Sequence, residues 1–213
     1  GTASGLSEGR MQMTEVFFTK TDALSDEWLF SKVYQMLCEK RKQKANRLVL
    51  REAKERSLAA GFLLFKALER RGLSDSAVIY DGGKPCVARE NVHFNLSHSG
   101  ERAMCVISEN EVSCDCQKIG LYNKNLAKKY FFEREITAIE RAEDKGAEFC
   151  RIWTLKESLL KLDGKGISGL KCADTAADND CFFKEYELSD GYKYTVCSRF
   201  DDFPESMEFI EIK

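Results

Sequence analysis

Two residues of opposite charge, Glu157 and Lys161, stand one helical turn apart in the stretch 151–161. Four apolar residues recur around them at the spacing of an amphipathic helix: Ile152, Leu155, Leu159 and Leu160. Gly164 and Gly166 follow and allow the backbone angles that end a helix. On this pattern alone, the two charges predict a surface ion pair worth about a few tenths of a kcal/mol. Whether they do chemistry depends on what the rest of the chain brings to them.

A second set of chemically capable residues lies in the basic segment 40–56, which holds Arg41, Lys44 and Arg56 and runs into Ser57. Three interpretations stay open: a solvated helix face, a nucleic-acid stripe, or an anion site where cations and a hydroxyl converge on phosphates. No aromatic platform for bases is interleaved with these cations. The formal net charge is -2, so no global field attracts nucleic acid or an acidic membrane. Any anion site must be local.

Small polar residues close the segment 93–100. Ser97 and His98 could present a hydroxyl, an imidazole and backbone N–H groups to an anion, or they could form an ordinary turn. Lys84 lies on a predicted turn at 81–85, where a lysine is usually just solvated. Asp115 lies on a predicted strand at 112–117, and the residue alone could be a mere strand terminator.

The number and spacing of the cysteines indicate a reducing compartment. Nine occur, an odd number without a C-x-x-C pair, and several lie in apolar runs where a free thiol packs as a small hydrophobic group. We therefore expect a reduced, cytoplasmic chain rather than a disulfide framework. Cys114 and Cys116 flank Asp115, but no second Cys/His pair lies near enough to predict zinc. No run approaches the ~20 apolar residues that span a bilayer, and residues 1–12 are expected to be a flexible leader or cloning scar.

The elements that must position these residues predict an α+β fold. The chain has 213 residues, with a hydrophobic fraction of 43% and a charged fraction of 32%, which is typical of a soluble globular protein. We expect helices from Ser25, which can cap the first, and over 126–142 and 151–161. Strands are predicted at 14–18, 77–80, 103–107, 112–117, 181–197 and 209–212. A polar break at 108–111 divides the chain into halves at 13–110 and 111–213, each with helices and a small antiparallel sheet.

Five motifs, in this order and spacing, resemble the surfactin-synthetase-type (Sfp-type) phosphopantetheinyl transferases. They are Gly-Lys-Pro at 83–85, Phe-Asn-Leu-Ser-His-Ser at 94–99, Asp115, Trp-Thr-Leu-Lys-Glu-Ser-Leu-Leu-Lys at 153–161 and Gly-Lys-Gly at 164–166. The resemblance covers nearly the whole chain from about residue 14. It implies a pseudo-twofold pair of α+β halves, with coenzyme A bound in the cleft between them. It also implies Mg²⁺-dependent transfer of the phosphopantetheine arm to a serine of an apo acyl or peptidyl carrier protein, with release of adenosine 3',5'-bisphosphate.

The resemblance also implies roles for individual residues. Asp115 and Glu157 would hold the metal, Glu157 would accept the serine proton directly or through water, and Lys161 would contact a pyrophosphate oxygen. Lys156 would be an additional phosphate contact, and Trp153 is expected to pack. The nucleotide, chiefly its ribose phosphate, would be held by Arg41, Lys44, Arg56, Ser57, Lys84, Ser97 and His98.

One departure from the family pattern is Gln117, which stands where bacterial members usually carry a further acid. Its carbonyl oxygen brings no charge, which motivates weaker metal affinity or a preference for Mn²⁺ as hypotheses. It also motivates the rival hypothesis of a coenzyme-A-binding paralogue that is impaired in transfer. Because one chain would supply both walls of the cleft, we expect a monomer. The sequence does not select among fatty-acid, polyketide and peptide-synthetase carriers.

Overall fold

The computed structural model describes residues 14–79, 85–87 and 92–213. The expected leader at 1–12 and Lys84, with most of its predicted turn, lie outside the described residues. Within the described part, no helix combines the length and the apolar character that a membrane crossing requires.

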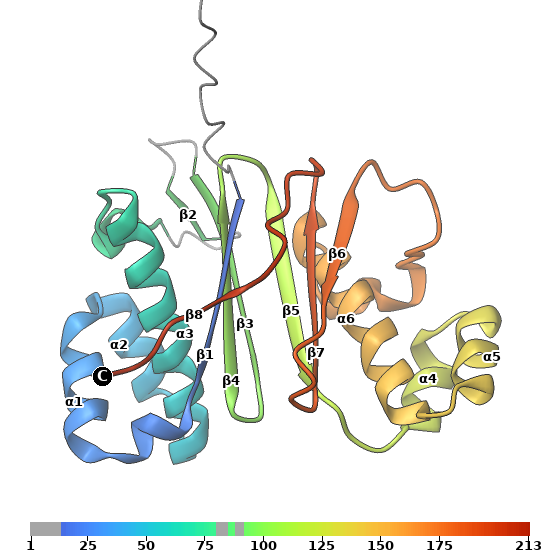
Figure 1. Ribbon diagram of the computed structural model, residues 1–213, viewed down its shortest axis with the longest axis horizontal. Helices are drawn as coiled ribbons and strands as arrows, with labels where there is room; N and C mark the ends of the chain where they lie inside the picture. The colour runs from blue at the N-terminus through green and yellow to red at the C-terminus, as the bar shows by residue number, and fades with distance from the viewer. Residues whose placement is uncertain (1–13, 80–84, 88–91) are drawn as a thin grey trace, which may run out of the picture.

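Two small sheets stand side by side in the centre of the molecule, and helices cover their outer faces (Figure 1). The first sheet contains, in spatial order, β2 (Cys86–Val87), β3 (Val92–Ser99), β4 (Arg102–Ser108), β1 (Thr14–Lys20) and β8 (Glu208–Phe209). The second contains β5 (Val112–Lys118), β7 (Tyr192–Ser198) and β6 (Phe182–Tyr186). All neighbouring strands are antiparallel except β1 and β8. β3 and β5 meet where the two sheets adjoin.

The helices form two groups, one for each sheet (Figure 1). Beside the first sheet lie α1 (Glu27–Met36), α2 (Glu39–Asn46) and α3 (Arg51–Arg70). Beside the second lie α4 (Lys124–Tyr130), α5 (Glu133–Arg141) and α6 (Lys145–Asp163). Short 3-10 helices complete the chain: η1 (Asp22–Ser25), η2 (Asp75–Ala77) and η3 (Ile167–Cys172). The predicted α+β class is confirmed, and the polar break at 108–111 does connect the two sheets.

Helix α6 has local signals at both ends. The side chain of Asp144 accepts a hydrogen bond from the Ala147 N–H at 2.9 Å and so caps the first turn. Gly164 ends the helix in the left-handed region, with φ of 70°, which glycine adopts without a Cβ clash. Between the caps, one side of the helix packs on β5 and β7. The predicted glycine stop is confirmed, but the helix begins at Lys145 rather than 151, and none of its side chains is exposed, because α5 and η3 cover other sides of it; it is buried rather than amphipathic.

Three sequence expectations need correction. The first helix is capped by Asp26, whose carboxylate accepts from the Leu29 N–H at 2.9 Å, whereas Ser25 ends η1. The single helix expected over 126–142 is two helices, α4 and α5, with extended backbone at Phe131 and Phe132 between them. The last strand is only Glu208–Phe209, and it pairs with β1 of the first sheet rather than with its own half. The chain end therefore crosses back over the expected boundary.

The core lies in layers that follow from this arrangement. One cluster fills the space between α1–α3 and the first sheet, and another lies between the two sheets and includes Val106, Cys114 and Tyr194. Further clusters lie under α6.

All nine cysteines are free, and five of them are buried, as the apolar runs predicted. Burial raises the pKa of the Cys116 thiol, which keeps it protonated as a small apolar group in the core.

Candidate active site

Three predicted site residues from three different elements meet where the two sheets adjoin. Asp115 on β5 is buried, and its Oδ1 accepts a hydrogen bond from the Ser97 hydroxyl on β3 at 2.8 Å. Lys161 on α6 donates to the same oxygen at 2.6 Å and to the Cys114 carbonyl at 3.1 Å. The fold thus brings together residues that stand up to 64 positions apart in the chain. This convergence is the geometric centre of the candidate site.

Glu157 lies one turn before Lys161 on the same helix and is half-buried. Burial and the nearby charge of Asp115 raise the pKa of its carboxyl, and Lys161 opposes them only in part. Burial would lower the pKa of Lys161, but the charge and hydrogen bond of Asp115 outweigh it and raise that pKa. Lys161 therefore holds its proton more firmly than a free lysine, and Glu157 is a stronger base than a free glutamate.

The donor set fits a hard divalent cation. Two neighbouring carboxylates of like charge favour a shared cation, and Mg²⁺ commonly takes one or two protein carboxylates and completes its shell with substrate oxygens and water. Gln117 is two residues beyond Asp115 on β5, so both side chains lie on one face of the strand. Its amide oxygen is uncharged. Among the described residues no three His, Cys, Asp or Glu side chains gather as a metal site, consistent with the missing third carboxylate.

Four of the predicted nucleotide ligands line one small cavity of about 180 Å³ next to the cluster. They are Arg41 and Lys44 on α2, Ser57 on α3 and His98 on β3. Pro85, which follows Lys84 in the chain, lines the same cavity.

The cations around this cavity affect one another. Burial, then the charges of Lys44, Arg56 and Lys161, lower the pKa of His98. Burial and Arg41 lower the pKa of Lys44. Besides burial, neighbouring cations contribute to both shifts, so these positive groups lie close together, and an anion bound among them would raise both pKa values. The cavity is thus suited to a phosphate.

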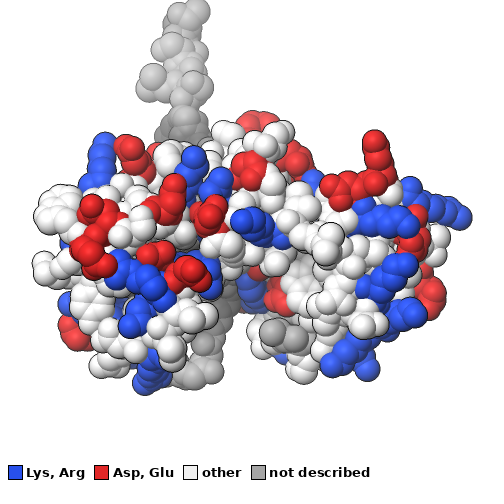
Figure 2. Space-filling model, turned by 90° about the horizontal axis from the view of Figure 1, so that it is seen from below, with Lys and Arg blue, Asp and Glu red and all other residues white. Residues whose placement is uncertain are grey.

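The basic segment 40–56 lies partly inside the molecule, which favours the anion-site interpretation over a nucleic-acid stripe. Arg41 and Ser57 are buried, and the cations of 40–56 turn partly inward toward the cavity. On the face seen in Figure 2, acidic and basic side chains are interleaved over the half that holds α1–α3. That surface lacks the single-sign field that a polyanion needs.

The expectation that Lys156 contacts phosphate is wrong. Its side chain is fully buried, and its ammonium donates to Glu135 Oε2 at 2.9 Å, Glu135 Oε1 at 3.1 Å and the Ala173 carbonyl at 2.7 Å. It also lies 4.5 Å from the ring centroid of Phe132. Successive helix residues point about 100° apart, so Lys156 faces α5 while Glu157 faces the cluster. Trp153 packs against aromatic rings, as predicted.

Asn95, to which the sequence analysis assigned no role, also belongs to the site. Asn95 and Ser99 lie on the same strand as Ser97 and accept hydrogen bonds from backbone N–H groups of β5. Their signal in the sequence is the period-two repeat of small polar residues at 95, 97 and 99, which predicts one polar face of a strand. What the repeat could not predict was that this face meets another sheet.

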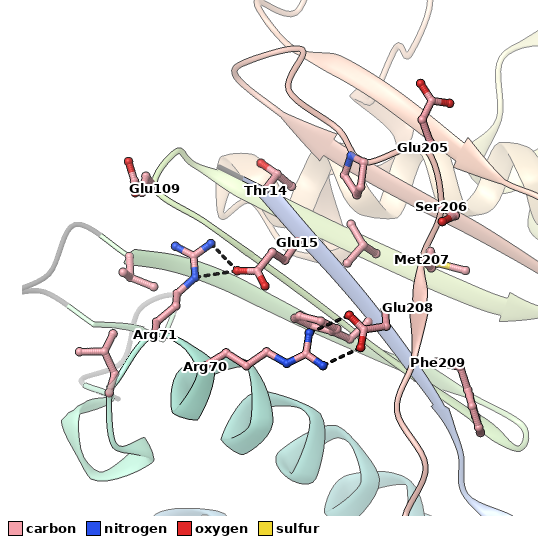
Figure 3. A pocket seen from close by; sticks show the side chains of 15 residues that line it. Thr14, Glu15, Arg70, Arg71, Glu109, Glu205, Ser206, Met207, Glu208 and Phe209 are labelled. Atoms are coloured by element: carbon pink, nitrogen blue, oxygen red, sulfur yellow. Dashed lines mark hydrogen bonds and ion pairs between the residues drawn. The ribbon is translucent and has the colours of Figure 1, made fainter. Parts of the chain in front are cut away.

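A second cavity of about 1230 Å³ contains none of the predicted site residues. It lies between the end of α3, β1 and the chain's last strand. Figure 3 shows Arg71 turned toward Glu15 and Arg70 toward Glu208. Arg70 makes two hydrogen bonds to Glu208, at 2.7 and 2.6 Å, and Arg71 makes two to Glu15, at 3.1 and 2.9 Å. The two arginines of this cavity are thus paired with carboxylates, whereas four of the predicted nucleotide ligands line the smaller cavity.

Comparisons with known proteins indicate the family of the chain. A sequence model described as the 4'-phosphopantetheinyl transferase superfamily matches residues 111–204, which include Asp115, Glu157 and Lys161. The chain is 28% identical over 194 residues to the 4'-phosphopantetheinyl transferase Sfp of Bacillus subtilis, covering 80% of this chain and 85% of that protein.

Two further relatives span most of the chain. The 4'-phosphopantetheinyl transferase gsp of Aneurinibacillus migulanus is 28% identical over 88% of this chain and 87% of its own length. The 4'-phosphopantetheinyl transferase AcpT of Salmonella typhimurium is 32% identical over 65% of this chain and 76% of its own length. The similarity is thus not confined to one half.

Proposed function

Because the chain belongs to the 4'-phosphopantetheinyl transferase superfamily, we propose that it moves the phosphopantetheine arm of coenzyme A to a serine of an apo carrier protein. The second product is adenosine 3',5'-bisphosphate. The observation that carries the proposal is the meeting of Asp115, Ser97 and Lys161 beside Glu157, next to a cavity lined by cations. A phosphoryl transfer needs this combination of acidic groups for a metal and a base, and cations for a multiply charged substrate.

Coenzyme A would bind with its nucleotide in the cationic cavity. Arg41, Lys44 and His98 supply positive charge and donors there, and Ser57 supplies a hydroxyl. Arg56 adds positive charge near His98, and Ser97 joins the cavity to the carboxylate cluster. These six groups, with Lys84, are our proposed contacts to the nucleotide and chiefly to its ribose phosphate.

Asp115 and Glu157 would hold Mg²⁺, with Mn²⁺ as the alternative metal and the Gln117 oxygen as a weak additional donor. When bound, the metal would neutralise pyrophosphate charge and stabilise the leaving group. The proposals of Mg²⁺ and of Mn²⁺ both rest on the two adjacent carboxylates, which suit a hard cation better than zinc or copper.

The chain's own residues account for the proton and for the charge that develops in the reaction. The serine oxygen forms a bond to the phosphorus next to the pantetheine arm, and the bond from that phosphorus to the adenosine bisphosphate oxygen breaks. Glu157 takes the serine proton, directly or through a water molecule, and its raised pKa makes it a better base than a free glutamate. Lys161 stays protonated and donates to an oxygen of the pyrophosphate, where it offsets the negative charge of the leaving group.

The remaining features of the proposal concern the setting. Nine free cysteines support a reducing compartment, and we propose a cytoplasmic enzyme. We propose a monomer of two pseudo-twofold halves, because residues of both halves already line one site within a single chain. The partner is an acyl or peptidyl carrier protein, of a pathway that the site does not select.

The experiment is to incubate the protein with coenzyme A, Mg²⁺ and a panel of apo carriers of the fatty-acid, polyketide and peptide-synthetase types. We expect the mass of at least one carrier to rise by one phosphopantetheine. No gain on any carrier, with coenzyme A still bound, would favour the impaired paralogue that Gln117 suggests. The retention of Asp115, Glu157 and Lys161 in one cluster argues against that rival.

A further inference from the structure

The seam between the two sheets is held by side chains rather than by a main-chain ladder. β3 and β5 belong to different sheets, yet three N–H groups of β5 donate to side-chain oxygens of β3. Cys114 N–H bonds to Asn95 Oδ1, Cys116 N–H to Ser97 Oγ and Lys118 N–H to Ser99 Oγ, each at 3.1 Å. Because a buried N–H without an acceptor is costly, these oxygens replace a missing neighbour strand.

The first two of these bonds hold the N–H groups of the two residues next to Asp115, Cys114 and Cys116. Asn95 is joined to Cys114 a second time, because its carbonyl oxygen accepts from the Cys114 thiol at 3.4 Å. The Cys114 carbonyl in turn accepts from Lys161 at 3.1 Å. A continuous chain of hydrogen bonds therefore runs from Asn95 through Cys114 to Lys161, and it fixes the backbone from which the Asp115 carboxylate projects.

From this geometry we infer that Asn95 is a positioning residue for the transfer reaction. Its side-chain oxygen holds the N–H of Cys114, the residue before Asp115, and through Cys114 it sets the spacing of Asp115 and Lys161. The inference rests on the proposed function of the same cluster. Residues that orient a metal ligand without touching the metal commonly contribute about 10–100-fold to metal affinity or activity.

A direct contact with coenzyme A is the rival role, since Asn95 also lines the cationic cavity. The two roles predict different kinetics. A contact to the bound nucleotide in ground and transition states alike would change KM and leave kcat unchanged. Positioning of Asp115 would change kcat and metal affinity and leave nucleotide binding nearly unchanged.

Ser99 provides a matched control on the same strand. Its hydroxyl accepts an N–H bond of the same 3.1 Å length, but from Lys118, three residues beyond Asp115. If the bonds serve only to join the sheets, Asn95→Ala and Ser99→Ala should have similar effects. If Asn95 positions Asp115, its removal should affect the site far more.

The test compares Asn95→Ala, Asn95→Asp and Ser99→Ala with the full-length wild-type protein. Binding of Mn²⁺ to the protein saturated with adenosine 3',5'-bisphosphate is followed by electron paramagnetic resonance, and kcat and KM for coenzyme A are measured with an apo carrier. We expect Asn95→Ala to weaken Mn²⁺ binding and lower kcat by about tenfold or more, with KM within about threefold. Asn95→Asp keeps the acceptor oxygen and should stay within about threefold in both, and Ser99→Ala within about twofold.

Three results would overturn the inference: equal losses in Asn95→Ala and Ser99→Ala, unchanged kcat and Mn²⁺ affinity in Asn95→Ala, or a raised KM as its sole effect. Thermal melting identifies a variant that fails to fold. If Asn95→Ala fails to fold, the test rests on Asn95→Asp, and a tenfold or larger loss of kcat or Mn²⁺ affinity in that variant would count against the inference. The Mn²⁺ measurement needs no transfer. A wild-type protein that modifies no carrier would therefore refute the proposed function, while the role of Asn95 would still be decided by metal affinity.

Discussion

Replacing Lys156 by methionine tests whether this residue is structural, as its contacts indicate, or a phosphate ligand. Methionine has a similar length and no charge. The substitution leaves the Glu135 carboxylate, which is buried, without the ammonium that now bonds to both of its oxygens. It also removes the donor to the Ala173 carbonyl. Helix α6 would then lose the hydrogen bonds of Lys156 to α5 and to the segment after η3.

The expected cost follows from burial. Lys156 is fully buried, and the Glu135 side chain is 9% exposed, so solvent cannot screen the charge that remains. Breaking a buried pair in this way costs about 3–5 kcal/mol. For a chain of this size, each kcal/mol shifts the melting temperature by about 2–4 °C, which gives a fall of roughly 6–20 °C. Glu135→Gln together with Lys156→Met leaves no orphan charge and keeps an acceptor for the Phe132 N–H, so it should recover more than half of the loss.

Urea and thermal unfolding followed by circular dichroism measure these changes, with coenzyme A affinity measured by calorimetry on the folded protein. Lys66→Met is the matched control, because Lys66 pairs with Glu69 on the solvent side of α3 and should contribute less than about 1 kcal/mol. The reasoning fails if Lys156→Met melts within about 2 °C of the wild type. It fails outright if stability is kept and coenzyme A affinity falls tenfold, since that is the signature of a phosphate contact.

Three further predictions concern the site itself. In metal-free protein the pKa of the Glu157 carboxyl should lie above the usual range of a glutamate. Asp115→Asn should lower that pKa, because it removes a like charge. Carbon-13 NMR of the Glu157 carboxyl measures both values, and the same pKa in Asp115→Asn and the wild type would contradict the prediction. Adenosine 3',5'-bisphosphate should raise the depressed pKa of His98, because it brings negative charge next to the imidazole. Binding of the bisphosphate should therefore take up protons and become tighter as the pH falls toward that pKa. Proton NMR of the two histidines measures the pKa of His98 with and without the bisphosphate, and equal values would contradict the prediction. Gln117→Glu should lower the Mg²⁺ concentration needed for half-maximal activity, because it adds a third carboxylate. Equal midpoints for the variant and the wild type in a metal titration would contradict the hypothesis that Gln117 weakens metal affinity.

Elements with local signals were predictable from the sequence. The apolar spacing and the glycine stop gave helix α6, and period-two composition gave β5 with nearly its observed bounds. Interactions between distant segments were not predictable in this way. The pairing of β8 with β1 and the split of α4 from α5 at Phe131 depend on what packs against them, which no local pattern encodes.

The site shows the same division. Asp115 and Lys161 are 46 positions apart, so only the family resemblance could connect them before the fold did. For Lys156 the resemblance misled, because a lysine next to a catalytic glutamate looks like a phosphate ligand until its partner Glu135, 21 positions away, is known. Asn95 was missed for a related reason: its acceptor role exists only where the two sheets meet.

The most direct test of the account is to compare the wild-type protein with Glu157→Gln, using coenzyme A, Mg²⁺ and an accepted apo carrier. Carrier mass reports transfer, and calorimetry with adenosine 3',5'-bisphosphate reports nucleotide binding. The account predicts that the wild type modifies the carrier, whereas Glu157→Gln binds the bisphosphate within about threefold of the wild type and adds phosphopantetheine at least about 100-fold more slowly. Near-normal transfer by Glu157→Gln would contradict the assignment of the reaction to this cluster.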